Sequence, residues 1–137
     1  KDAAYKKEIA PFLALNKIEN DDPLPLAYYY RSFVERGVAP TATAADGLAR
    51  AAELAPFDLG LRLNLAEYQL GTKDYAAARS NLVPIAYYPE GGPMAAGART
   101  LIERIDGGKP PTQQEASQIM EDSLKAAQAT GGAKGKA

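Results

Sequence analysis

Prolines divide the central part of the chain into segments of equal length. They stand at positions 23, 56 and 89, so each is 33 residues from the next. Other residues recur 34 positions apart, namely Gly37 and Gly71, Ala44 and Ala78, and Leu48 and Leu82. Self-similarity at this period is typical of helical-repeat proteins, in which each repeat is a pair of helices. We therefore expect an all-α fold, an α-solenoid of antiparallel helix pairs.

The amino-acid composition narrows the chemistry that the chain can perform. With 137 residues it is long enough for one domain with its own core. It has no cysteine and no histidine, which excludes disulfides, thiol nucleophiles, His-based triads and the usual zinc ligands. The net charge of −1 gives no attraction for nucleic acid, and no apolar run is long enough to span a membrane. We expect no cofactor, no metal and no nucleic-acid partner.

Apolar periodicity and capping residues predict the individual helices. They cover residues 4–19, 24–36, 42–54, 57–70, 75–88 and 93–105, and a last helix begins after Thr112. Thr112 and Glu115 have the spacing of a capping box. About seven helices result. Residues 1–22 would hold the second helix of a truncated preceding repeat, 23–129 the repeats with a terminal capping helix, and 130–137 a disordered tail.

The second repeat carries the pattern of a known family. Its landmarks are Leu65 and Ala66 in the first helix, Asp74 and Tyr75 at the turn, Ala78 and Leu82 in the second helix, and the closing Pro89. This pattern resembles a tetratricopeptide repeat. The first repeat shares Ser32, Ala44, Leu48, Ala51 and Pro56 with it, but has Arg31 where Leu65 stands and Thr41 where Tyr75 stands. The resemblance covers residues 24–106, extends by analogy to about 129, and implies a right-handed stack of helical hairpins.

A second resemblance concerns residues 82–93, LVPIAYYPEGGP. This stretch is similar to the last repeats of bacterial envelope proteins that carry a peptidase-like domain upstream. It implies that the chain is the C-terminal part of such a protein. The compartment stays open between the bacterial periplasm or envelope and the cytoplasm.

The first resemblance also implies where a partner binds. Tetratricopeptide repeats bind peptides or proteins on their concave face, which the first helix of each repeat lines. The groove residues expected here are Tyr29, Tyr30, Phe33, Arg36, Leu63, Asn64, Glu67 and Arg99. Aromatic side chains such as those of residues 28–30 are favoured at binding surfaces. The alternative is that these tyrosines pack against residues 1–19 or against an upstream unit.

One subclass of the family grips a C-terminal carboxylate with Lys and Asn. The nearest positions here carry Tyr29, Phe33, Leu63 and Glu67, so we do not expect that clamp. The acidic residues are scattered without the paired spacing of acid–base catalysis, and no phosphate-binding loop is present. We therefore expect a non-catalytic module that binds a peptide or partner domain. The alternative is a structural C-terminal appendage that packs on and stabilises an upstream, possibly peptidase-like, domain.

Overall fold

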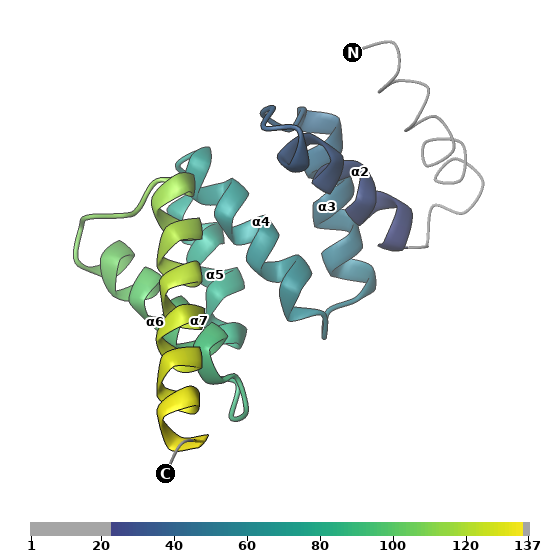
Figure 1. Ribbon diagram of the computed structural model, residues 1–137. Helices are drawn as coiled ribbons and strands as arrows, with labels where there is room; N and C mark the ends of the chain where they lie inside the picture. Colours follow the sequence, from purple (N-terminus) through teal and green to yellow (C-terminus); the bar gives the residue numbers. More distant parts are fainter. Residues whose placement is uncertain (1–22, 136–137) are drawn as a thin grey trace. The chain divides into compact units, whose positions relative to one another are not determined.

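The computed structural model describes residues 23–135, with side chains as far as residue 130 (Figure 1). The helices are α2 (Pro23–Glu35), α3 (Ala42–Leu54), α4 (Leu59–Gly71), α5 (Tyr75–Ala86), α6 (Gly92–Asp106) and α7 (Gln113–Gly135). Within this range no residue belongs to a β-strand, which confirms the all-α prediction. The helix expected over 4–19 and the truncated repeat expected over 1–22 lie outside the described residues.

The chain divides into two compact units, one ending at Leu61 and the other beginning at Arg62. The first unit holds α2 and α3, and the second holds most of α4 together with α5, α6 and α7. Helix pairs of the predicted kind are present within each unit. The solenoid that would join them stays a prediction.

In the first unit α2 packs against α3 through small side chains. Ala44, Leu48 and Ala51 of α3 are fully buried, and their spacing puts them on one face of the helix. Leu26 of α2 lies directly over Gly47, where an added Cβ would stand 3.4 Å from Leu26 Cδ2. The small residues of α3 thus allow the close helix crossing that their sequence predicts.

Four helices begin at a capping side chain. Before α4 it is the Asp58 carboxylate, which accepts a hydrogen bond from the Leu61 N–H at 3.2 Å. The Thr41 hydroxyl before α3 and the Thr112 hydroxyl before α7 each accept a hydrogen bond from the backbone N–H three residues later, at 3.2 and 3.1 Å. The Asp74 carboxylate accepts the equivalent bond before α5 at 3.4 Å. The Thr112 hydroxyl also donates to the Glu115 carboxylate at 3.3 Å, so the predicted capping pair is present.

Three helices, α2, α4 and α6, end in one recurring turn. Gly37, Lys73 and Gly108 have φ of 68°, 64° and 76°, the left-handed conformation. The N–H groups of residues 38, 74 and 109 donate to the carbonyls of residues 33, 69 and 104 at 3.0, 2.8 and 3.0 Å. These bonds define the Schellman motif, which satisfies the last carbonyls of a helix. The structural counterpart of Gly37 is therefore Lys73, and not Gly71 as the 34-residue interval indicated.

In the second unit α5 packs on α6, and α6 packs on α7. Leu65, Ala78 and Leu82, which the repeat pattern places in the core, are 8%, 0% and 0% exposed. Arg79 of α5 also forms two hydrogen bonds, of 2.7 and 2.9 Å, to the Asp106 carboxylate at the end of α6. The core positions of the second repeat are thus confirmed.

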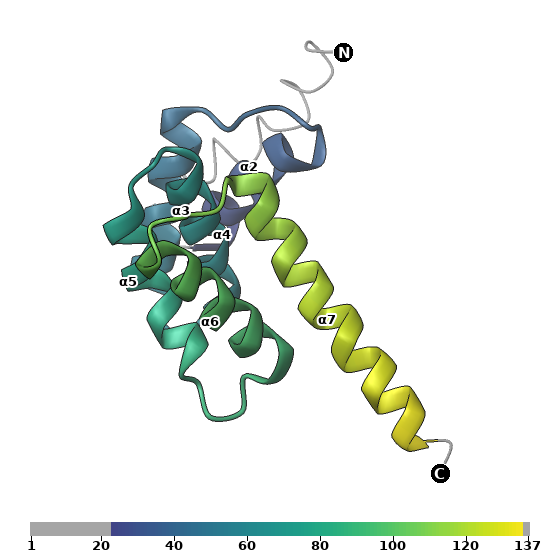
Figure 2. The same ribbon diagram turned by 90° about the vertical axis from the view of Figure 1, so that its left-hand side faces the viewer.

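The last helix is longer and less covered than expected. α7 runs to Gly135, past residue 129, where we expected it to end and a disordered tail to begin. Of its apolar residues, Ala116 and Met120 are buried, but Leu124 is 47% exposed. From Glu121 to residue 130 every side chain except that of Ser123 is exposed. Figure 2 shows α6 and α7 separating toward the C-terminal end of α7.

Candidate partner-binding groove

The four groove residues expected on and just after α2 do not form one surface. Tyr30 and Phe33 are 2% and 7% exposed, so they belong to the core. Tyr29 is half-buried, and its ring meets that of Phe33 edge-on with centroids 5.2 Å apart. Only Arg36 of the four is exposed. Tyr30 and Phe33 thus pack in the interior, because the buried face of α2 includes their positions, and their contact with a partner stays a prediction.

Of the four groove residues expected in the second unit, three are half-buried and Arg99 is exposed. Leu63, Asn64 and Glu67 are half-buried on α4. The Ser117 hydroxyl of α7 donates to Glu67 Oε2 at 3.3 Å, so the last helix lies against α4 at this point. Burial raises the pKa of Glu67 to about 7, and the hydrogen bond from Ser117 offsets part of that rise.

Arg99, the predicted groove residue of α6, has a structural role. Its guanidinium Nη1 donates to the Ala86 carbonyl at 2.8 Å. Ala86 is the last residue of α5, where helix carbonyls lack a partner within the helix and favour a cation. Arg99 therefore caps α5 and joins it to α6.

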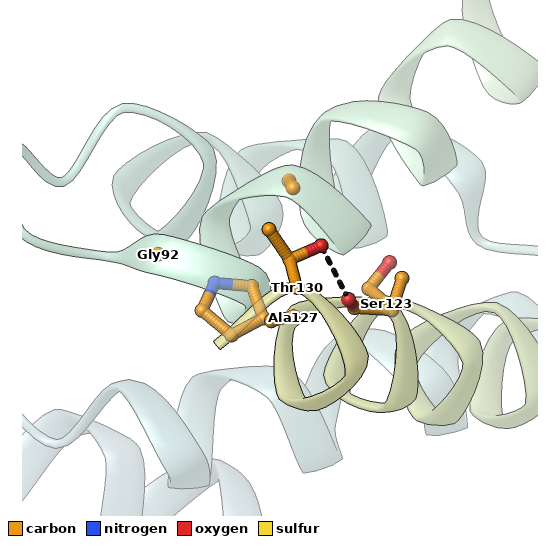
Figure 3. A pocket seen from close by; sticks show the side chains of 7 residues that line it. Gly92, Ser123, Ala127 and Thr130 are labelled. Carbon is orange, nitrogen blue, oxygen red and sulfur yellow. Dashed lines mark hydrogen bonds between the residues drawn. The ribbon is translucent and has the colours of Figure 1, made fainter. Parts of the chain in front are cut away.

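The structure instead offers an open groove between the start of α6 and the second half of α7 (Figure 3). Its volume is about 600 Å³, within the range of about 300–1,000 Å³ that is typical of ligand pockets. The residues that line it are Gly92, Pro93 and Ala96 from α6, and Ser123, Ala126, Ala127 and Thr130 from α7. On α7 they follow i, i+3, i+4 and i+7 spacing, so they share one face of the helix.

Local sequence explains why the groove opens where it does. Gly97 brings α6 and α7 into contact, since a Cβ at this position would stand 2.6 Å from Met120 Sδ. Toward the N-terminus of α6, Gly92, Pro93 and Ala96 present little side-chain volume to α7. Gly92 has a φ of 53°, which lets the loop turn sharply into the helix just before Pro93. The helices thus meet at Gly97 and leave space beyond it.

The chemistry of the groove is mainly apolar. None of its lining residues carries a charge, and its polar side chains are the hydroxyls of Ser123 and Thr130. The Thr130 hydroxyl already donates to the Ala126 carbonyl at 3.0 Å (Figure 3). Such a groove can receive apolar side chains from a partner, but it offers no group for acid–base or nucleophilic chemistry.

Sequence reasoning missed this groove because its walls consist of small residues. The large apolar side chains of α7, those of Ile119, Met120 and Leu124, are not among the residues that line the groove. The available signal was the spacing of Ser123, Ala127 and Thr130 on a face that continues from Met120.

Metal-binding clusters and membrane-spanning helices can be assessed for the part of the chain that the structure describes. Over that part, no three acidic side chains gather closely enough to hold a metal ion. Over the same residues, none of the helices is both long enough and apolar enough to cross a bilayer. Comparison of the chain with protein families, with curated proteins and with solved structures finds no match.

Proposed function

We propose that this chain is a non-catalytic helical-repeat module of the tetratricopeptide type that binds a peptide or a partner protein. The observation that carries the proposal is the open apolar groove between α6 and α7. A ligand would insert apolar side chains between Ala96 on one wall and Ala127 on the other. Burial of apolar surface would supply the affinity, at roughly 25 cal/mol per Å² before the cost of association is subtracted.

The helices that form the groove are braced from outside it. Arg104 of α6 donates to the Glu115 carboxylate of α7 at 3.0 Å, and Arg99 ties α6 to α5. These contacts hold α6 and the first turn of α7 in place, which reduces the ordering cost of binding on the α6 wall. This arrangement favours recognition of a partner by shape and apolar contact.

A second function is favoured by the face of α2 that carries the exposed residues Leu24 and Tyr28. Leu24 and Tyr28 lie one turn apart on this helix and are 55% and 44% exposed. Both residues also make interactions within the chain, and an upstream domain would cover the part of their side chains that is exposed. The chain would then serve as a structural appendage whose first unit stabilises an upstream domain.

The groove proposal is tested by filling the groove. The Ala127→Leu variant places a branched side chain in the groove, and Ala129→Leu adds the same side chain on the opposite face of α7, outside the lining. A displayed peptide library is selected against the wild-type chain and then screened against both variants. We expect the selected peptides to bind the wild type and the Ala129→Leu variant, and to bind the Ala127→Leu variant much more weakly or not at all.

Peptides that bind all three chains equally would refute the groove as the contact site. Circular dichroism of each variant shows whether it retains the helical fold. The appendage function is tested separately, by replacing Leu24 and Tyr28 with serine and measuring the thermal stability of a longer chain that includes the upstream domain. Unchanged stability would exclude this function.

A further inference from the structure

The first turns of α7 rest on α4 at two adjacent places. Gln113 lies beside Gly71, since a Cβ there would stand 2.7 Å from Gln113 Oε1. One turn later the Ser117 hydroxyl bonds to Glu67 Oε2 at 3.3 Å. We call this contact, formed by Glu67, Gly71, Gln113 and Ser117, the α4–α7 seat. It joins α7 to a helix that stands three places earlier in the chain, with α5 and α6 in between.

The α4–α7 seat contains a carboxyl group without a charged partner. On α4 the residues one turn from Glu67 are Leu63, Asn64, Leu70 and Gly71, and none of them is charged. Within the described residues no cation forms an ion pair with Glu67, and its hydrogen bond comes from a neutral hydroxyl. An ionised carboxylate that has lost much of its hydration and has no cation nearby is unstable there.

The charged groups of the neighbouring described helices form no ion pair with Glu67, and most of them are engaged with other groups. On α7, Glu115 pairs with Arg104 at 3.0 Å and Glu121 pairs with Lys125 at 2.9 Å. Asp122 accepts a hydrogen bond from Gln118 at 2.9 Å.

The charged groups of α4, α5 and α6 are also accounted for. On α6, Arg99 donates to the Ala86 carbonyl and Glu103 is exposed. On α5, Arg79 pairs with Asp106, the last residue of α6, at 2.7 Å. On α4, Arg62 donates to the Asn81 side chain at 3.5 Å.

We propose that the α4–α7 seat is a pH-sensitive latch, closed when Glu67 is neutral and loosened when Glu67 ionises. A neutral carboxyl group is tolerated at this half-buried position and keeps its bond to Ser117. An ionised carboxylate gains more from water than from a single hydroxyl, and water reaches it when the first turns of α7 lift from α4. Burial raises the pKa of Glu67 to about 7, so the change falls in the neutral range.

The size of the effect follows from linkage. The carboxyl titrates at about 7 in the closed latch and at the ordinary value of 4.5 once α7 has lifted. The ratio of lifted to closed chains therefore rises roughly tenfold between about pH 6 and about pH 8. The inference does not depend on the proposed function, because it concerns the free chain without any ligand.

Amide hydrogen exchange tests the latch directly. Exchange of the amides of residues 117–121 is measured at about pH 6 and about pH 8 and corrected for the intrinsic base catalysis of exchange. We expect it to be roughly tenfold faster at the higher pH in the wild-type chain, and unchanged in Glu67→Gln, whose side chain stays neutral. Glu103→Gln removes an exposed carboxylate of α6 and should behave as the wild type.

A second measurement needs no variant. The carboxyl carbon of Glu67 is followed by NMR as the pH is raised, together with the amides of Gln113 and Ser117. A common midpoint near 7 supports the latch, and a midpoint near the ordinary 4.5 overturns it. Equal exchange rates in wild type and Glu67→Gln at the higher pH would overturn it as well.

Discussion

Replacing Lys73 with glycine should stabilise the protein. Lys73 is the only described residue other than glycine with a positive φ, at 64°, and it ends α4 in the turn that Gly37 and Gly108 form elsewhere. A left-handed conformation costs a residue with a side chain about 1–2 kcal/mol, and glycine avoids this cost. Glycine loses about 0.5–1 kcal/mol through its greater freedom in the unfolded chain. We therefore expect Lys73→Gly to raise the free energy of unfolding by about 0.5–1 kcal/mol.

Substituting alanine for glycine at the two equivalent turns measures the energetic cost of the left-handed backbone conformation by itself. A Cβ added at Gly37 or at Gly108 meets no atom within 4 Å, so alanine there introduces strain without a steric clash. Gly37→Ala and Gly108→Ala should each lower the free energy of unfolding by about 1 kcal/mol. Lys125→Gly, which removes the same side chain as Lys73→Gly but within a helix, should not stabilise the chain.

The measurement is urea unfolding followed by far-UV circular dichroism, with all four variants compared to the wild type. The order of stability should be Lys73→Gly, wild type, and then the two glycine-to-alanine variants. If Lys73→Gly is no more stable than the wild type, the three turns are not equivalent and the structural repeat that they define is refuted.

Three other substitutions probe the second unit. Leu82→Ala empties a fully buried position and should cost about 2–5 kcal/mol in urea unfolding; a smaller cost would mean that Leu82 is not in the core. Glu67→Gln should leave the free energy of unfolding unchanged below about pH 4.5 and raise it by about 3 kcal/mol above about pH 7. The reason is that the wild-type carboxyl group ionises more easily in the unfolded chain than in the folded one, so the folded wild type loses stability as the pH rises, whereas glutamine stays neutral. A parallel pH dependence of the two chains would contradict this, with Glu103→Gln as the control. Arg99→Met keeps the aliphatic stem but removes the cap on Ala86, and should cost about 1 kcal/mol; no loss of thermal stability would show that the cap is dispensable.

The helix boundaries could be predicted because they depend on local chemistry. α3 covers residues 42–54 as predicted, since Thr41 supplies a cap and Pro56 stops the helix soon after Leu54. α5 continues through Pro84 but ends at Ala86, two positions before the predicted end. Core positions such as Ala78 and Leu82 could also be predicted, because residues that recur at the repeat interval are the ones that pack in the core.

The register of the repeat and the candidate groove could not be predicted, because both depend on how separate segments pack. The interval between Gly37 and Gly71 suggested an equivalence, but a lysine in left-handed conformation takes the glycine position. Glu67 and Arg99 look like groove residues on isolated helices, and only the packed neighbours show that Ser117 and Ala86 engage them. The groove itself arises from the divergence of two helices, which no single segment encodes.

The exposed second half of α7 has a thermodynamic consequence for recognition. A helical stretch of this length is marginal in water without tertiary support, and from Glu121 onward α7 has little of it. One wall of the groove is therefore intact in only a fraction of the molecules at any moment. If a ligand binds in the proposed groove, its apparent affinity is lowered in proportion to that fraction. Substitutions that raise the helix content of residues 121–130 should then tighten binding, although they make no contact with the ligand.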